Sequence, residues 1–180
     1  MFIIIEGIDG SGKSGLIDAL TSFYPNYKRA DIREQWAKVD AKSQTSRKKF
    51  FVDYYQQHKN DNIIVDRFHL SEAVYDLTLR NTKTDIADFE KKIFGNDVSN
   101  VILITIDVHE AVAQSRIKKR DGKDEKQDLA KERSIFLRLH NQSMIQHKLL
   151  VYNDKFDILV KEVKEKIEDV CGISGKVFTK

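Results

Sequence analysis

The chain has 180 residues, about the length of one domain, which excludes a large multidomain machine. Hydrophobic residues make up 41% and charged residues 33% of the sequence, which is typical of a compact soluble domain and excludes a disordered chain. The formal charge is only +3, from 31 Lys and Arg against 28 Asp and Glu, and both signs are interleaved. This balance argues against a nucleic-acid partner, so any anion site must be local.

Metal-binding and membrane signals are weak. Cys171 is the only cysteine, which excludes an intrachain disulfide and a multi-cysteine zinc site. The 5 histidines are mostly scattered and form no HExxH pattern, so we do not expect a metal held by histidines. The apolar run at residues 2–5 is too short for a signal-peptide core or a membrane span. We therefore expect a cytoplasmic protein with no membrane partner.

Short branched apolar runs alternate with helical periodicity along the chain. The sequence predicts strands at residues 2–5, 27–32, 62–65, 101–106 and 158–160. It predicts helices at residues 16–24, 45–58, 70–77, 86–93 and 108–115, through Phe136 and Leu139, and at 163–170. Such alternation is typical of right-handed crossover units. We expect a single α/β domain over residues 1–180, with three layers, a five-stranded parallel sheet and helices on both faces. Its ligand should lie beyond the carboxyl ends of the strands.

A glycine-rich loop follows the first predicted strand. Residues 7–14, GIDGSGKS, satisfy the GxxxxGK[ST] pattern of a phosphate-binding loop, or P-loop. Glycines let backbone N–H groups converge on phosphate oxygens, and the helix that begins near Lys13 presents its positive dipole end to the same anion. We expect Lys13 to bridge the β- and γ-phosphates of ATP and Ser14 to hold Mg²⁺. The loop residues expected to bind the phosphates are Gly7, Gly10, Ser11, Gly12, Lys13 and Ser14.

The rest of the chain narrows the class of nucleotide-binding protein. A switch GTPase usually carries a guanine-reading NKxD segment late in the chain, and none is present. A motor ATPase normally needs more residues than this chain has in order to couple hydrolysis to movement. The length is that of a small kinase.

Three segments resemble the landmarks of thymidylate kinases, a family of P-loop nucleoside monophosphate kinases. They are EGIDGSGKS at residues 6–14, Asp66-Arg67-Phe68 followed by Ser71 and Tyr75, and IDVHEAVAQSRIKKR at 106–120. The resemblance spans roughly residues 2–144. It implies transfer of the ATP γ-phosphoryl group to a deoxynucleoside monophosphate, with dTMP as the leading candidate, and it implies a homodimer because family members are commonly dimers.

Three of the matching residues have an explanation from their own chemistry. Asp66 ends an apolar strand next to the loop, where a carboxylate can orient the Mg²⁺ hydration shell or cap the next helix. Arg67 carries a planar five-donor fork suited to the acceptor phosphate, and the resemblance implies that it binds that phosphate. The resemblance also implies that Asp9 binds a sugar 3′-hydroxyl; otherwise Asp9 is a turn carboxylate that bonds its own backbone.

Further positions are assigned through the resemblance. Arg33 and Glu34 lie where the family has an Arg-Glu-Pro element. The resemblance implies that Arg33 contacts a phosphate and that Glu34 is a carboxylate near the active centre; otherwise both belong to an ordinary surface loop. Gln35 replaces the proline. The residues implied to wall the nucleoside pocket are Phe51, Phe68, Ser71 and Tyr75, although an aromatic stripe at helical spacing is also typical of plain core.

A basic segment matches the family's lid, at about residues 118–128, although a basic run is usually just solvated. Gly10 lies where some thymidylate kinases place an arginine. The cation at the transition state must then come from elsewhere, and Arg116 and Arg120 are the natural sources. The predicted catalytic group is Asp9, Lys13, Arg67, Arg116 and Arg120.

Base choice and acceptor type stay open at this point. Thymidylate kinases typically carry an arginine that reads the thymine edge, and Arg47 is the candidate here, whereas Glu72 lies where an amide or a small polar residue is common. The segment Glu34-Gln35-Trp36 distantly resembles the Glu-X-X-Trp element of deoxynucleoside kinases, whose glutamate is a base for the 5′-hydroxyl. A kinase acting on a modified base in DNA and a non-catalytic nucleotide sensor are further alternatives.

Overall fold

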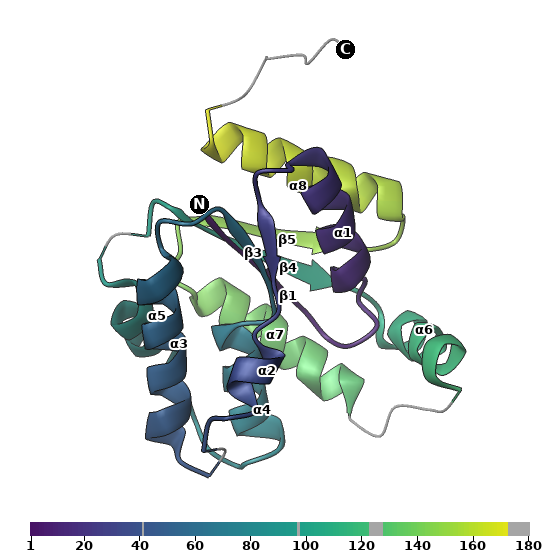
Figure 1. Ribbon diagram of the computed structural model, residues 1–180. Coiled ribbons are helices and arrows are strands. Elements are labelled where there is room, and N and C mark those ends of the chain that lie inside the picture. Colours follow the sequence, from purple (N-terminus) through teal and green to yellow (C-terminus); the bar gives the residue numbers. More distant parts are fainter. Residues whose placement is uncertain (41, 97, 123–127, 173–180) are drawn as a thin grey trace.

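A five-stranded sheet runs through the centre of the computed structural model in the order β2-β3-β1-β4-β5 (Figure 1). The strands are β1 (Phe2–Glu6), β2 (Lys28–Ala30), β3 (Ile63–Asp66), β4 (Val101–Asp107) and β5 (His147–Tyr152). All of their pairings are parallel. The structure describes residues 1–40, 42–96, 98–122 and 128–172, and of residue 33 the backbone alone. The predicted α/β architecture is confirmed.

Helices cover both faces of the sheet because the central strand β1 is apolar on both sides. Phe2 and Ile4 face the core beneath α3, α4, α5 and α7, and Ile3 and Ile5 face the core beneath α1 and α8 (Figure 1). A strand buried on both faces is typical of parallel sheets. The helices are α1 (Lys13–Phe23), α2 (Arg33–Trp36), α3 (Gln44–His58), α4 (His69–Thr78), α5 (Ile86–Phe94), α6 (Glu110–Asp121), α7 (Leu129–Gln142) and α8 (Phe156–Val170).

The predicted strand at residues 158–160 is wrong, because these residues belong to helix α8. Leu159 is fully buried with Val163 and Ile167, which follow it at the four-residue spacing of a helix face, whereas Ile158 is 45% exposed. The fifth strand lies earlier, at β5. It pairs with β4 alone and buries only Val151 completely, so its sequence lacks the continuous apolar run that marks the inner strands.

Other boundaries also shift. The strand predicted at 27–32 is reduced to the three residues of β2, and the short helix α2 follows it. Residues 118–121 of the predicted lid form the last turn of α6, and Gly122 ends that helix in a left-handed conformation. Lys123 and residues 124–127 lie outside the described residues.

In the part of the chain that the structure covers, no helix is long and apolar enough to cross a membrane.

Substitutions in α8 test the corrected assignment. Leu159→Ala should lower the free energy of unfolding by about 2–5 kcal/mol because it opens a cavity in the core. Ile158→Ala should change it by less than about 1 kcal/mol because the side chain is half exposed. Chemical denaturation of both variants measures the difference. A larger loss from Ile158→Ala would contradict the helical register.

Candidate active site

The loop between β1 and α1 depends on glycines at its close contacts. Gly10 has φ +74°, and a Cβ at this position would lie 2.5 Å from the carbonyl oxygen of Ala113. Gly12 has φ +101°, and its Cβ would collide with the side-chain amide of Asn153. An L-residue with a side chain would therefore be strained at both points. The loop and the start of α1 form the cradle that the sequence predicts for phosphate groups.

Lys13 lies inside this cradle. Its Nζ donates hydrogen bonds to the carbonyl oxygens of Gly7 (3.0 Å) and Ile8 (2.7 Å), and the residue is only 6% exposed. Burial lowers the pKa of Lys13 to about 7, and the nearby charge of Arg67 acts in the same direction. A bound polyphosphate would supply the missing negative charge, so the geometry and the electrostatics suit the predicted phosphate-binding role.

Asn153, a residue that the sequence did not point to, stabilises the loop by a hydrogen bond. Its Nδ2 donates a 2.7 Å hydrogen bond to the carbonyl oxygen of Ser11, and its backbone N–H donates to Asp107 at 2.8 Å. The residue is 3% exposed. A polar residue directly after a strand is a recognisable signal, but it could not be used while the fifth strand was placed at residues 158–160.

Glu6 joins the loop to the start of α4. Its Oε1 accepts the backbone N–H groups of Phe68 (2.8 Å), Leu70 (3.0 Å) and Ser71 (3.2 Å), and its Oε2 accepts the Ser71 hydroxyl. The carboxylate is fully buried at a helix N-terminus, where negative charge is favourable. Glu6 is the first residue of the EGIDGSGKS segment, and the motif alone assigns it no role. An acidic residue that ends an otherwise apolar strand was the available signal.

Arg67 has a left-handed backbone with φ +65°. Its N–H donates to Ile5 at 3.0 Å, and the next N–H, of Phe68, donates to Glu6. A residue with a side chain rarely adopts this conformation, so the neighbouring hydrogen bonds hold it in place. The guanidinium then turns back to the loop, where Nη1 donates to the Gly7 carbonyl at 3.1 Å.

Asp9 lies between two arginines. Its Oδ2 accepts a 2.9 Å hydrogen bond from Nη2 of Arg120, and its Oδ1 lies 3.8 Å from Nη2 of Arg67. Burial raises the pKa of Asp9, but the hydrogen bond from Arg120 and the charges of Lys13 and Arg67 outweigh it, and the pKa lies below its usual value. Asp9 is therefore a charged link between the cations of the site, and its predicted contact with a sugar hydroxyl stays a prediction.

One pocket of about 800 Å³ brings most of the predicted residues together. The predicted residues that line it are Asp9, Gly10, Gly12, Lys13, Ser14, Phe51, Asp66, Arg67, Phe68, Ser71, Tyr75, Arg116 and Arg120. Four other residues also line it, Gly15, Ile32, Trp36 and Glu72. Gly7 and Ser11 belong to the loop without lining the pocket, Glu34 is exposed away from it, and the Arg33 side chain is outside the described residues.

The two predicted metal ligands lie on the pocket wall. Asp66 Oδ2 accepts a 3.3 Å hydrogen bond from Arg29, while Asp66 Oδ1 is buried and has no partner. Ser14 is exposed. Among the described residues, no group of three or more His, Cys, Asp or Glu could hold a metal ion. A hydroxyl and one carboxylate oxygen without a partner suit Mg²⁺, which keeps several waters and binds through substrate phosphates.

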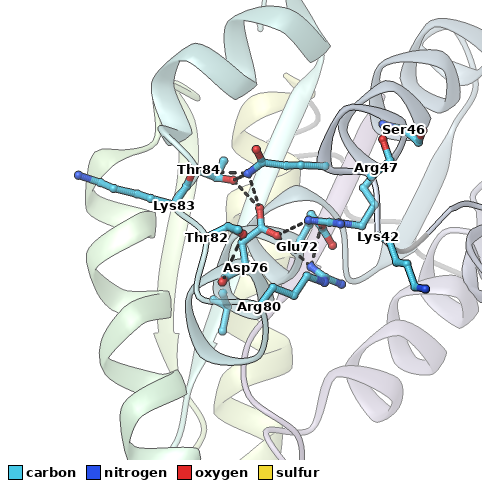
Figure 2. Close-up of polar contacts among 12 residues, drawn as sticks. Lys42, Ser46, Arg47, Glu72, Asp76, Arg80, Thr82, Lys83 and Thr84 are labelled. Carbon is cyan, nitrogen blue, oxygen red and sulfur yellow. Dashed lines mark hydrogen bonds and ion pairs between the residues drawn. The ribbon is translucent and has the colours of Figure 1, made fainter.

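Glu72, which lines the pocket, belongs to a buried ionic cluster (Figure 2). Arg47 on α3 is 2% exposed and donates to Glu72 Oε1 at 2.5 Å and to Asp76 Oδ1 at 2.6 Å, both on α4. Arg47 does not line the pocket, so the expected thymine-reading arginine is not presented there. Burial raises the pKa of Glu72 although Arg47 and Arg80 oppose the shift. Burial also acts to raise the pKa of Asp76, but its hydrogen bonds lower it to about 2.

Comparisons with known proteins identify the fold. No family model and no curated protein sequence matches the chain. The YorR protein of Bacillus subtilis, in complex with phosphorylated GDP, is similar with a TM-score of 0.67 and 19% identity, over 93% of this chain and 96% of that one. Deoxyadenosine kinase from M. mycoides with bound dCTP is similar with a TM-score of 0.59 and 22% identity, over 94% of this chain and 100% of that one. Thymidylate kinase from Candida albicans is similar with a TM-score of 0.59 and 20% identity, over 93% of this chain and 91% of that one. The chain has the fold of P-loop kinases.

The strain at Arg67 predicts an inverted order of stability for two substitutions. Arg67→Gly should be more stable than Arg67→Ala by about 1 kcal/mol, because glycine adopts φ +65° without the penalty that alanine pays. At an ordinary helical or extended position the order would be the reverse. Urea denaturation of the two variants measures it, and a more stable Arg67→Ala would show that the left-handed conformation is wrong.

The lowered pKa of Lys13 predicts proton uptake when ATP binds. Because the pKa is about 7, Lys13 is mostly neutral at pH 8 in the free protein, and a bound triphosphate restores its charge. Binding at pH 8 should therefore take up about one proton per site. Calorimetry in buffers of different ionisation enthalpy measures this number. Lys13→Arg is the control, because arginine stays charged and should remove the uptake; equal uptake by both proteins would contradict the assignment.

Proposed function

We propose that the protein transfers the γ-phosphoryl group of ATP to a deoxynucleoside monophosphate. The observation that carries this proposal is the convergence of Lys13, Arg67, Arg116 and Arg120 on one pocket that aromatic side chains also line. Phosphoryl transfer between two phosphorylated molecules needs positive charge and alignment more than covalent chemistry. The kinase names of several proteins with this fold support the same reaction class.

Each cation has a position from which it can act. Lys13 and the loop N–H groups would bind the triphosphate tail, and Arg67 would hold the acceptor phosphate beside it. Arg116 donates to the carbonyl of Gly10 at 3.3 Å, so it reaches the loop from α6. Arg120 reaches the same end of the pocket through Asp9 and would place charge over the transferring group. Mg²⁺, held by Ser14 and Asp66, would neutralise phosphate charge and orient the triphosphate.

The transfer itself needs no group on the protein to form a covalent bond. An oxygen of the acceptor phosphate attacks the γ-phosphorus while the bond to the β–γ bridging oxygen breaks, which gives ADP and a nucleoside diphosphate. The attacking oxygen already carries negative charge, so the reaction requires no strong base. The resemblance to thymidylate kinases implies dTMP as the first acceptor to examine.

A nucleoside acceptor is less well supported by this pocket. A 5′-hydroxyl needs a carboxylate base within hydrogen-bonding reach. The described carboxylates that line the pocket are Asp9, Asp66 and Glu72, and an arginine donates to each of them. Glu34, the candidate base from the sequence, is exposed away from the pocket. The described cations of the lining, Lys13, Arg67, Arg116 and Arg120, outnumber its carboxylates, which favours an acceptor that brings its own negative charge.

An acceptor screen tests the proposal. Each of the four common deoxynucleosides and its 5′-monophosphate is offered separately with Mg·ATP, and ADP is followed. We expect ADP formation with at least one monophosphate and none with the nucleosides, and Lys13→Ala should abolish it because the triphosphate loses its lysine. Turnover of nucleosides alone, or ATP binding without acceptor-dependent ADP, would refute the proposal in favour of a nucleoside kinase or a nucleotide sensor.

A further inference from the structure

The two carboxylates of the buried cluster differ in how completely they are bonded (Figure 2). Asp76 is fully buried, and both of its oxygens are occupied. Oδ1 accepts from Arg47 (2.6 Å) and Arg80 (3.1 Å), and Oδ2 accepts from Gln44 (3.0 Å) and Thr84 (2.7 Å). A buried charge with all its hydrogen bonds made is a structural group, and it offers nothing to a ligand.

Glu72, one turn earlier on α4, uses only one of its oxygens. Oε1 accepts from Nε of Arg47 (2.5 Å) and Nη1 of Arg80 (3.0 Å). From the described part of the chain, no hydrogen bond reaches Oε2. Oε2 is also not among the buried polar atoms that lack a partner, and Glu72 lines the pocket. Glu72 is 2% exposed, so its second oxygen lies at the pocket wall without a described partner, while the two guanidinium groups fix the first.

Glu72 lines the pocket together with several aromatic residues. One of them is Phe68, the N-cap residue of α4, which comes one turn before Glu72 along the chain. Phe51 packs edge-on against Phe68 with 4.9 Å between ring centroids, and Trp36 lies 5.2 Å from Phe51. A flat base is the part of a nucleotide that such a wall suits. Glu72 places a carboxylate on the same pocket lining as these rings.

Arg47 and Arg80 both act to keep the Glu72 carboxylate charged, against the effect of burial. In the charged form a carboxylate only accepts hydrogen bonds. Adenine, cytosine and guanine present an exocyclic amino group, which donates at the edge of the base. Thymine and uracil present a single ring N–H between two carbonyl oxygens, whose lone pairs would face the same negative charge.

We infer that Glu72 selects the acceptor by its base and favours deoxynucleoside monophosphates with an exocyclic amino group over dTMP and dUMP. This inference rests on the proposed function and changes its leading acceptor. The reason is that the arginine expected to read thymine is turned away into the cluster, and the group presented in its place is a hydrogen-bond acceptor.

Matched acceptors test the inference on the unmodified protein. The pairs dCMP and dUMP, and dAMP and dIMP, each differ by the exchange of an amino group for a carbonyl. We expect kcat/KM with Mg·ATP to favour an amino member over its partner by about 10- to 100-fold, the range for one hydrogen bond to a charged group. Calorimetric Kd values of the same nucleotides should rank in the same order without turnover.

Glu72→Gln gives a second measurement. A glutamine amide presents either an acceptor or a donor to the pocket. The preference for the amino nucleotide within the favoured pair, dCMP over dUMP or dAMP over dIMP, should therefore fall by at least about tenfold. Glu162→Gln, the same change at an exposed position of α8, is the control and should keep the ranking. If Glu72→Gln does not fold because Arg47 loses an anionic partner, the wild-type pairs still decide.

The outcomes separate this inference from the proposed function. Turnover of dUMP, dTMP and dIMP as efficient as that of the amino nucleotides would overturn the base preference and leave the kinase proposal standing. An amino preference that survives Glu72→Gln in a folded protein would assign the preference to another residue and overturn the role of Glu72. Absence of turnover and binding with every monophosphate would overturn both proposals together.

Discussion

The buried carboxylate of Glu6 is the interaction on which the site depends. It ends the central strand, the phosphate-binding loop begins at the next residue, and its oxygens bind three N–H groups and a hydroxyl at the start of α4. One side chain thus sets the position of α4 relative to the loop. The left-handed Arg67, the aromatic Phe68 and the carboxylate Glu72 all take their places from that attachment.

Charge is distributed unevenly along the pocket. Near the loop, cations surround Asp9, and the free protein holds them close together only because backbone carbonyls and this carboxylate compensate part of the repulsion. Burial nevertheless lowers the pKa of Lys13 to about 7, because the nearby carboxylates offset only part of the cost of burying its charge. Behind Glu72, two arginines and two carboxylates form a balanced cluster, and its other members do not line the pocket. The cationic side chains on the described lining all bond to loop residues, so the positive charge of the pocket is concentrated there.

Sequence reasoning located the loop, the Asp66-Arg67 step and the sheet because each has a local signal: a fixed glycine spacing, a polar pair after an apolar strand, and strands buried on both faces. It misplaced the fifth strand because an edge strand buries few residues, and the apolar stripe of α8 contained a strand-like triplet. The support given by Asn153 was lost with that strand. The direction of Arg47 could not be predicted, since it depends on two carboxylates that only tertiary packing brings to it.

The two sides of the sheet serve different halves of the site. The loop is braced by α1 and by Asn153 after β5, whereas the aromatic wall of the pocket comes from α2, α3 and α4 across the sheet (Figure 1). Glu6 and Arg67 join the two halves, since one binds the start of α4 and the other binds the Gly7 carbonyl. Proteins with this fold are named for different substrates. Trp36 and Phe51 contact each other at the aromatic wall, so substitutions there can reshape the pocket while the hydrogen bonds of the loop stay as they are.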